Sequence, residues 1–271
     1  MRRIILTLAL ILSLGAGMCR GQEFITHRGV VPDGYNFWVY LPDDYNPLAA
    51  DMPVVIFLHG RSLCGHDLNQ VMRYGTLDAL KKGRKINAVV IAPQNPGESW
   101  KPDKIIRVLD WCLEHYPADG DRVYALGMSL GGFGTMDLAG AYPDRIAAGV
   151  ALCGGCYLKD LHGLGQVPMW IMHGTADEKV GVNESRKVVE KLIADGDDGH
   201  VMYDWLKGYN HGKLARCFYM PMIYDWLFDH NLRDQERQVN WTYTISDADF
   251  DNAYRNFDYP GGRNIPVRNY K

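Results

Sequence analysis

The sequence predicts an α/β fold, in which a mostly parallel, twisted sheet has helices on both of its faces. Short apolar runs rich in β-branched residues recur along the chain, and stretches with helical periodicity separate them. Such alternation produces parallel strands, because each helix crosses over one face of the sheet. A chain of 271 residues with 47% hydrophobic and 23% charged residues suffices for one domain with a full core.

The predicted strands are short runs of strand-forming residues, and two of them, 53–59 and 88–92, are apolar runs whose side chains would be buried on both faces of the sheet. Continuous runs, in contrast to alternating ones, are typical of strands in a parallel sheet. In chain order the predicted strands are 35–41, 53–59, 88–92, 121–126, 146–152, 168–172 and 201–206.

Helices are predicted between these strands. Pro102 suits the first turn of a helix, the apolar residues after it recur at helical spacing, and Pro117 ends the segment. Further helices are predicted at 130–141, 183–194 and 221–230, and a shorter helical stretch precedes the third strand. We therefore expect crossover connections throughout the sheet.

Residues 1–21 and 232–271 differ in composition from the chain between them. The first segment has Arg2 and Arg3, an apolar run and then small residues, which is the layout of a secretory signal peptide, and its apolar run is short for a membrane span. We therefore expect a periplasmic or secreted protein without a stable membrane span, with an uncleaved anchor as the alternative. The last segment is polar and lacks a helical stripe, so we interpret it as an extension that packs back on the domain or on a second subunit. A single domain at 22–231 is expected between them.

Charge and cysteine content limit the classes of function. The leader carries three positive charges and no acids, so its removal changes the formal net charge from -3 to about -6, without basic clusters, and no nucleic-acid partner is expected. Five cysteines follow the leader, so at least one thiol is expected to stay unpaired. Cys153 and Cys156 follow a late strand, unlike a thioredoxin-type redox pair, and we expect a local disulfide or two structural thiols there. The other three are Cys64, Cys112 and Cys217.

A candidate nucleophile stands in the run Gly127-Met128-Ser129-Leu130-Gly131. This G-x-S-x-G pattern lies between a predicted strand and a predicted helix, which is the context the motif requires. A serine on so sharp a turn is held in strained backbone geometry, and glycines beside it avoid steric collision. The turn also places Ser129 at a helix N-terminus, where free amides favour negative charge. The alternative is a glycine-rich turn that contains a serine by chance.

A serine nucleophile needs a base and an orienting carboxylate, which in this motif class follow the serine at the ends of later strands. Asp177 lies just beyond the strand 168–172, with the adjacent Glu178 as the runner-up and a solvated or capping carboxylate as the alternative. His211 lies in the loop GYNHG between the last strand and the final helix. The nine histidines show no metal-ligand spacing, so neither a metal nor a cofactor is expected.

Charge that develops on a carbonyl oxygen needs aimed donors, an oxyanion hole. The backbone amide of Leu130, the residue after the nucleophile, is the first candidate, and the amide of Arg61, in the loop after FLHG, is the second. The alternative for Arg61 is a surface arginine whose backbone forms a turn. Trp100 follows a strand and is a candidate for stacking on a sugar or an aromatic acyl group, with packing at the helix start as its alternative.

Together the segments LHGRSLCG, GMSLGGFG, HGTADEKV and YNHG resemble serine esterases of the α/β-hydrolase superfamily. The resemblance is to the feruloyl esterase and acetyl xylan esterase group, carbohydrate esterase family one, and to polyester depolymerases, and it covers roughly 32–231. Ser62 stands where relatives often have a second glycine, which leaves the donor in that loop open. The resemblance implies a triad and an oxyanion hole formed by Ser129, Asp177, His211, Arg61 and Leu130.

The resemblance also implies an α/β-hydrolase fold without a large lid domain, since only about fifteen residues separate the strands that end at 152 and begin at 168. An open site suits acyl groups on a bulky carrier. The implied reaction is hydrolysis of acetyl or feruloyl esters, on plant polysaccharide or its fragments, through an acyl-enzyme. The alternatives are a serine peptidase of the prolyl-oligopeptidase type, a non-catalytic carbohydrate-binding relative, and an acyltransferase.

Overall fold

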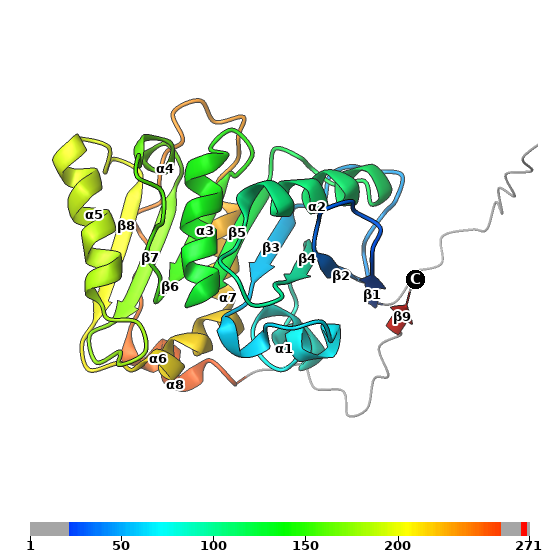
Figure 1. Cartoon of the computed structure of the whole chain (residues 1–271), viewed down its shortest axis with the longest axis horizontal. Coiled ribbons are helices and arrows are strands. Elements are labelled where there is room, and N and C mark those ends of the chain that lie inside the picture. The colour runs from blue at the N-terminus through cyan, green and yellow to red at the C-terminus, as the bar shows by residue number, and fades with distance from the viewer. Residues whose placement is uncertain (1–21, 256–266, 270–271) are drawn as a thin grey trace, which may run out of the picture.

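The computed structural model describes residues 22–255 and 267–269. Within these residues, nine strands form one sheet in the order β8-β7-β6-β5-β3-β4-β2-β1-β9 (Figure 1). The strands are β1 (Glu23–His27), β2 (Asn36–Leu41), β3 (Val54–Leu58), β4 (Val89–Gln94), β5 (Val123–Met128), β6 (Ala148–Leu152), β7 (Met169–Gly174), β8 (Val201–Leu206) and β9 (Val267–Asn269). β2 is antiparallel to β1 and to β4, whereas β3 to β8 pair in parallel and β9 is parallel to β1.

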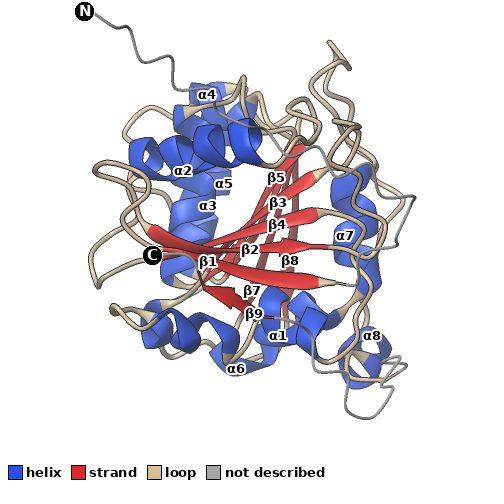
Figure 2. Ribbon diagram, turned by 90° about the vertical axis from the view of Figure 1, so that its right-hand side faces the viewer, coloured by secondary structure: helices blue, strands red, loops and turns tan. Residues whose placement is uncertain are grey.

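Helices cover both faces of this sheet. Figure 2 shows α2, α3 and α5 on one side and α7 on the other. The helices are α1 (Thr76–Lys81), α2 (Pro102–His115), α3 (Leu130–Ala141), α4 (His162–Gly165), α5 (Asn183–Asp195), α6 (His211–Leu214), α7 (Pro221–Phe228) and α8 (Asp247–Asn252), and the 3₁₀ helices are η1 (Arg61–Leu63), η2 (Leu68–Met72) and η3 (Ala215–Tyr219).

The core lies in two apolar layers, one on each face of the sheet. Alternate residues of β3 divide between the layers, because side chains point to opposite faces along a strand. Val55 and Phe57 pack with the layer under α1 and α7, whereas Ile56 and Leu58 pack with the layer under α2, α3 and α5. The predicted fold class, a mostly parallel sheet with helices on both faces, is therefore confirmed.

The connection between β6 and β7 is short, as expected for a fold without a large lid domain. Along the described chain, that connection holds a single helix, α4, of four residues. No described helix combines the length and the apolar character that crossing a membrane would require. The predicted signal peptide, 1–21, lies outside the described residues.

The predicted extension packs on its own domain and contributes regular structure that the sequence analysis did not predict. Leu232 donates from its amide to the carbonyl of Asp121 at 2.9 Å, and the Arg237 guanidinium donates to the carbonyls of Ile146 at 2.6 Å and Ala147 at 3.1 Å. Further along the extension lie α8 and the three-residue β9. Both elements are too short for their sequences to show a periodic pattern that would predict them.

The five cysteines after the leader are free thiols. Cys153 and Cys156 therefore match the second of the two expectations for them, structural thiols. Burial raises the pKa of each of these two thiols well above its usual range. A thiol whose pKa is raised in this way reacts slowly, because the thiolate is the reactive form.

Candidate active site

Ser129 lies on the turn between β5 and α3 with φ of 60° and ψ of −122°. A side chain in this left-handed region is strained, so the neighbouring packing must hold it there. A Cβ on Gly131 would lie 1.8 Å from the carbonyl oxygen of Leu58, and one on Gly127 would lie 2.3 Å from the carbonyl oxygen of Gly131. The two motif glycines are thus required by contact with backbone, which allows the tight turn that presents the serine.

Asp177 follows β7 and is hydrogen-bonded through both carboxylate oxygens. Its Oδ2 accepts from Nδ1 of His211 at 2.7 Å, and its Oδ1 accepts from the amides of Lys179 at 2.8 Å and Val180 at 2.9 Å. Burial raises the pKa of Asp177, but the hydrogen bonds from Val180, His211 and Lys179 outweigh it, so the pKa lies below its usual value. The carboxylate is therefore ionised at neutral pH and holds the imidazole of His211 in one orientation.

His211 is the first residue of α6, at the end of the sheet where the parallel strands terminate (Figure 1). Asn210 caps this short helix by accepting a hydrogen bond from the amide of Lys213 at 3.0 Å. Because Nδ1 of His211 donates to Asp177, its Nε2 is left as the acceptor in the neutral ring. Glu178, the runner-up acid, is not the carboxylate that contacts His211.

Ser129 and His211 line one cavity of about 760 Å³. Both predicted oxyanion residues, Arg61 and Leu130, line it too. They are the first residues of η1 and α3, so their amides have no acceptor within their own helix and remain available to a ligand. The structure thus brings four of the predicted residues to one cavity and places Asp177 behind His211.

Much of the cavity wall is apolar. Met128, Phe133 and Val180 contribute to it, and the ring of Phe133 stacks on that of Tyr157 with centroids 4.7 Å apart and planes 20° apart. Tyr157 is 58% exposed, so this ring pair offers a flat apolar surface beside the serine. Large apolar area with few polar groups is typical of ligand sites.

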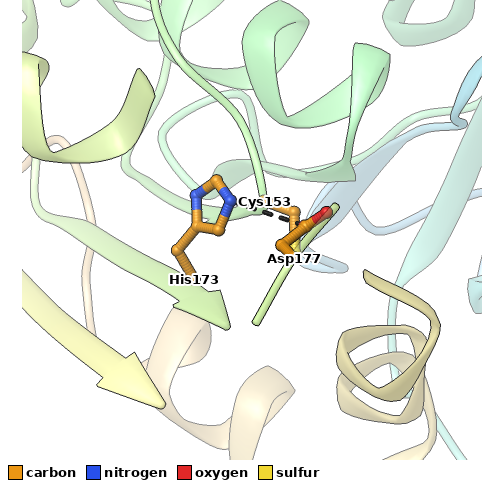
Figure 3. A group of neighbouring side chains, drawn as sticks. All are labelled: Cys153, His173 and Asp177. Atoms are coloured by element: carbon orange, nitrogen blue, oxygen red, sulfur yellow. Dashed lines mark ion pairs between the residues drawn. The ribbon is translucent and has the colours of Figure 1, made fainter. Parts of the chain in front are cut away.

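A buried group behind Asp177 was not found by the sequence analysis. Figure 3 shows Cys153, His173 and Asp177 together, with Nε2 of His173 3.5 Å from Oδ2 of Asp177. Nε2 of His173 donates to the carbonyl of Val180 at 2.8 Å, and Nδ1 lies 2.7 Å from the hydroxyl of Ser185. Burial lowers the pKa of His173. A buried imidazole and a neutral thiol therefore enclose the ionised carboxylate of Asp177.

The donor types in this group, sulfur, imidazole and carboxylate, also suit zinc. A metal ion there would compete with His211 for Asp177 and with Val180 for His173. We therefore interpret the group as one that positions the carboxylate. The sequence feature that could have indicated this group is the position of His173, at the end of the strand that leads to Asp177.

Trp100 is buried in the core and does not line the cavity, which corrects one expectation. The side chain is 2% exposed, and its indole N–H donates to the carbonyl of His59 at 3.2 Å. Its ring packs against Tyr35 and His59 at centroid distances of 5.1 and 5.0 Å. Gly134 of α3 lies directly on the ring. Packing at the helix start, the alternative reading, is what the structure shows, because the indole fills the gap between α3 and the sheet.

Comparisons with known proteins concern the sequence and the fold as a whole. No protein-family model matches the chain. It is 26% identical over 170 residues to feruloyl esterase B of Neurospora crassa, a match that covers 54% of this chain and 53% of the relative. It is 28% identical over 155 residues to acetylxylan esterase A of Emericella nidulans, covering 50% of this chain and 48% of the relative. The chain thus spans about half the length of the curated relatives it matches.

Superposition on solved structures identifies the fold. A thermostable esterase of known structure superposes with a TM-score of 0.62 at 24% identity, over 77% of this chain and 62% of that one. At this level of identity the likeness concerns the fold. The chain has the α/β-hydrolase fold and is similar in sequence to curated feruloyl and acetylxylan esterases.

Proposed function

We propose that this protein is a serine esterase that hydrolyses carboxylic esters with Ser129 as nucleophile, His211 as general base and Asp177 as the orienting carboxylate. The observation that carries the proposal is the 2.7 Å hydrogen bond from His211 to a buried Asp177, made beside the cavity that Ser129 also lines. The similarity to curated esterases supports the same reaction class.

The proposed reaction has two halves. In the first, Nε2 of His211 takes the proton of the Ser129 hydroxyl as its oxygen attacks the ester carbonyl, and the tetrahedral intermediate collapses as His211 gives that proton to the leaving alcohol. In the second, His211 takes a proton from water as the water oxygen attacks the acyl-enzyme, and then gives that proton to the Ser129 oxygen as the acid leaves. The amides of Leu130 and Arg61 hold the oxyanion in both halves. Ionised Asp177 stabilises the imidazolium that forms each time.

The proposed substrates are acetyl or feruloyl esters of plant polysaccharide or its fragments. The names of the two relatives indicate these two acyl groups. The apolar wall and the stacked pair of Phe133 and Tyr157 suit an aromatic acyl group, because flat rings bury area well against each other. We place the protein in the periplasm or outside the cell, with 1–21 as a cleaved leader.

The test is an ester panel of nitrophenyl acetate, methyl ferulate and acetylated xylan, with the parent and Ser129→Ala side by side. We expect Ser129→Ala to lower kcat by a factor on the order of 10⁴ or more, because only the oxyanion contacts remain. Ser99→Ala, which removes a hydroxyl outside the cavity, should keep the parent's rate. A fluorophosphonate should label the parent and fail to label Ser129→Ala. A parent that hydrolyses none of the three esters would contradict the proposal.

A further inference from the structure

We infer that Tyr74 is a catalytic residue, whose phenolic hydroxyl is a third donor to the oxyanion beside the amides of Leu130 and Arg61. The inference rests on the proposed esterase function. It concerns a residue that no motif of the sequence singled out, between η2 and α1.

The position of the hydroxyl relative to the nucleophile is fixed by Gly60. The amide of Gly60 donates to Oη of Tyr74 at 3.2 Å. A Cβ on Gly60 would lie 2.8 Å from Oη of Tyr74 and 3.4 Å from Cβ of Ser129. Oη and the serine side chain therefore flank the same small space, which stays open because residue 60 has no side chain. Tyr74 and Ser129 also line the same cavity as Arg61 and Leu130.

The hydroxyl has a proton left to give. Its oxygen accepts from the Gly60 amide, so its own O–H must be directed elsewhere. The other hydroxyl near it, Oγ of Ser62, lies 3.5 Å away on an exposed side chain, at the limit of a hydrogen bond. Tyrosine hydroxyls are among the side-chain donors that stabilise oxyanions. An unspent donor at the edge of the nucleophile's cavity is therefore suited to charge that develops there.

An oxyanion donor must also be held in place before the reaction, and the packing around Tyr74 provides this. Gly75, the next residue, has φ of 91°, and a Cβ there would lie 2.2 Å from the ring of Phe57 in β3. The chain at 74–75 thus lies directly on the sheet. The ring of Tyr74 is partly buried and lies 6.5 Å from that of Phe218 in η3. The phenol is anchored at the core and its hydroxyl end reaches the cavity.

The test is Tyr74→Phe, which removes the hydroxyl and keeps the ring. With nitrophenyl acetate, kcat should fall by about 10-fold to 1000-fold, the range for loss of one oxyanion donor, while KM changes less than about threefold. Binding of an arylboronic acid, which forms a tetrahedral adduct with the serine, should weaken by a similar factor. Tyr203→Phe, which removes a hydroxyl from the distant edge strand β8, should change neither quantity, and thermal unfolding should show both variants folded.

Each other result has a definite meaning. If Tyr74→Phe keeps the parent's kcat and boronate affinity while the parent shows Ser129-dependent turnover, the Tyr74 assignment is wrong and the esterase proposal stands. A rise in KM alone would also overturn the assignment, because it reports binding that is equal in the ground state and the transition state. A parent without Ser129-dependent turnover or fluorophosphonate labelling would overturn both proposals together.

Discussion

Single residues determine how the serine turn is built. The strained backbone at Ser129 persists because glycines beside it let α3 approach the ends of β3, β5 and β6. A Cβ on Gly132, for example, would lie 2.5 Å from the carbonyl oxygen of Leu152. These contacts are with backbone atoms, which have no rotamer by which to move away. Alanine at these positions must therefore displace the helix or the strand.

We predict that Gly131→Ala lowers the free energy of unfolding by about 3 kcal/mol or more and abolishes turnover, since its Cβ would meet the Leu58 carbonyl at 1.8 Å. Urea denaturation and the ester assay measure the two effects. Gly199→Ala is the control, because no atom lies within 4 Å of its Cβ, and its stability should change by at most about 0.5 kcal/mol. Equal behaviour of the two variants would contradict the steric account.

Asp177→Asn should lower kcat by about 10³-fold to 10⁴-fold, because an amide neither fixes the imidazole of His211 in the same way nor stabilises its cation. Steady-state kinetics on methyl ferulate provide the measurement. Glu178→Gln is the matched control, since the adjacent carboxylate makes no contact with His211 in the described structure, and its kcat should match the parent's. A larger loss in Glu178→Gln than in Asp177→Asn would reverse the two roles.

At the scale of elements, the extension buttresses the loop that carries His211. The helix α8 begins with a capping box in which the amide of Ser246 donates to Asp249 at 2.8 Å. Phe250 of this helix is fully buried and packs edge-on against Tyr209 at 4.6 Å. The hydroxyl of Tyr209 donates to Asp247. Because Tyr209 lies two residues before His211, the extension fixes the backbone from which the base projects.

Phe250→Ala should therefore lower both stability and turnover. Removal of a buried phenyl ring costs about 3 to 5 kcal/mol of unfolding free energy, and kcat should fall even where the variant is folded, because His211 is held less firmly. Trp241→Ala, which truncates a 55% exposed ring of the same extension, should leave both nearly unchanged. The comparison uses urea denaturation and kinetics at a temperature where both variants are native; kcat preserved in Phe250→Ala would separate the extension from the site.

Across the whole molecule, buried neutral histidines couple folding to pH. His59 is fully buried, its Nε2 accepts from the amide of Asn95 at 3.0 Å, and burial lowers its pKa to about 4. Burial also lowers the pKa of His27 to about 4, with a smaller contribution from His115. In the unfolded chain both rings gain their proton as the pH falls through about 6.5, the ordinary pKa of histidine. Their contribution to stability is therefore complete above about pH 6.5 and is lost as the pH falls toward 4.

We predict that the free energy of unfolding falls steadily between pH 6.5 and pH 4, with about 3 kcal/mol of the decrease due to His59. Urea denaturation at half-unit pH intervals measures it. His59→Gln should be less stable than the parent at pH 7.5, because the Asn95 bond is disturbed, and should depend less steeply on pH below 6.5. A parent whose stability is constant across this interval would refute the prediction.

The sequence alone determined the alternation of strands and helices, because burial on two faces leaves a continuous apolar run and burial on one face leaves a helical stripe. It also determined the local turn at Ser129, because a turn this tight requires residues without a side chain at nearby positions, and the glycines of the motif are visible in the sequence. The short elements β1, β9 and α8 carry no such periodicity. They form because neighbouring parts of the folded chain offer β1 and β9 strand partners and give Phe250 a place in the core.

Only the tertiary structure decided which side chains meet. Asp177 and the runner-up Glu178 are adjacent carboxylates in the sequence, and the fold buries Asp177 against His211. The sequence left two roles open for Trp100, stacking on a ligand and packing at the helix start, and the contact of its ring with α3 decides for packing. Tyr74, between η2 and α1, and His173, at the end of β7, were given no role from the sequence, and each contacts or lines the site only in the folded chain. These contacts join residues that are far apart in the sequence. They depend on which strand ends lie side by side in the assembled sheet, and no local stretch of sequence determines that order.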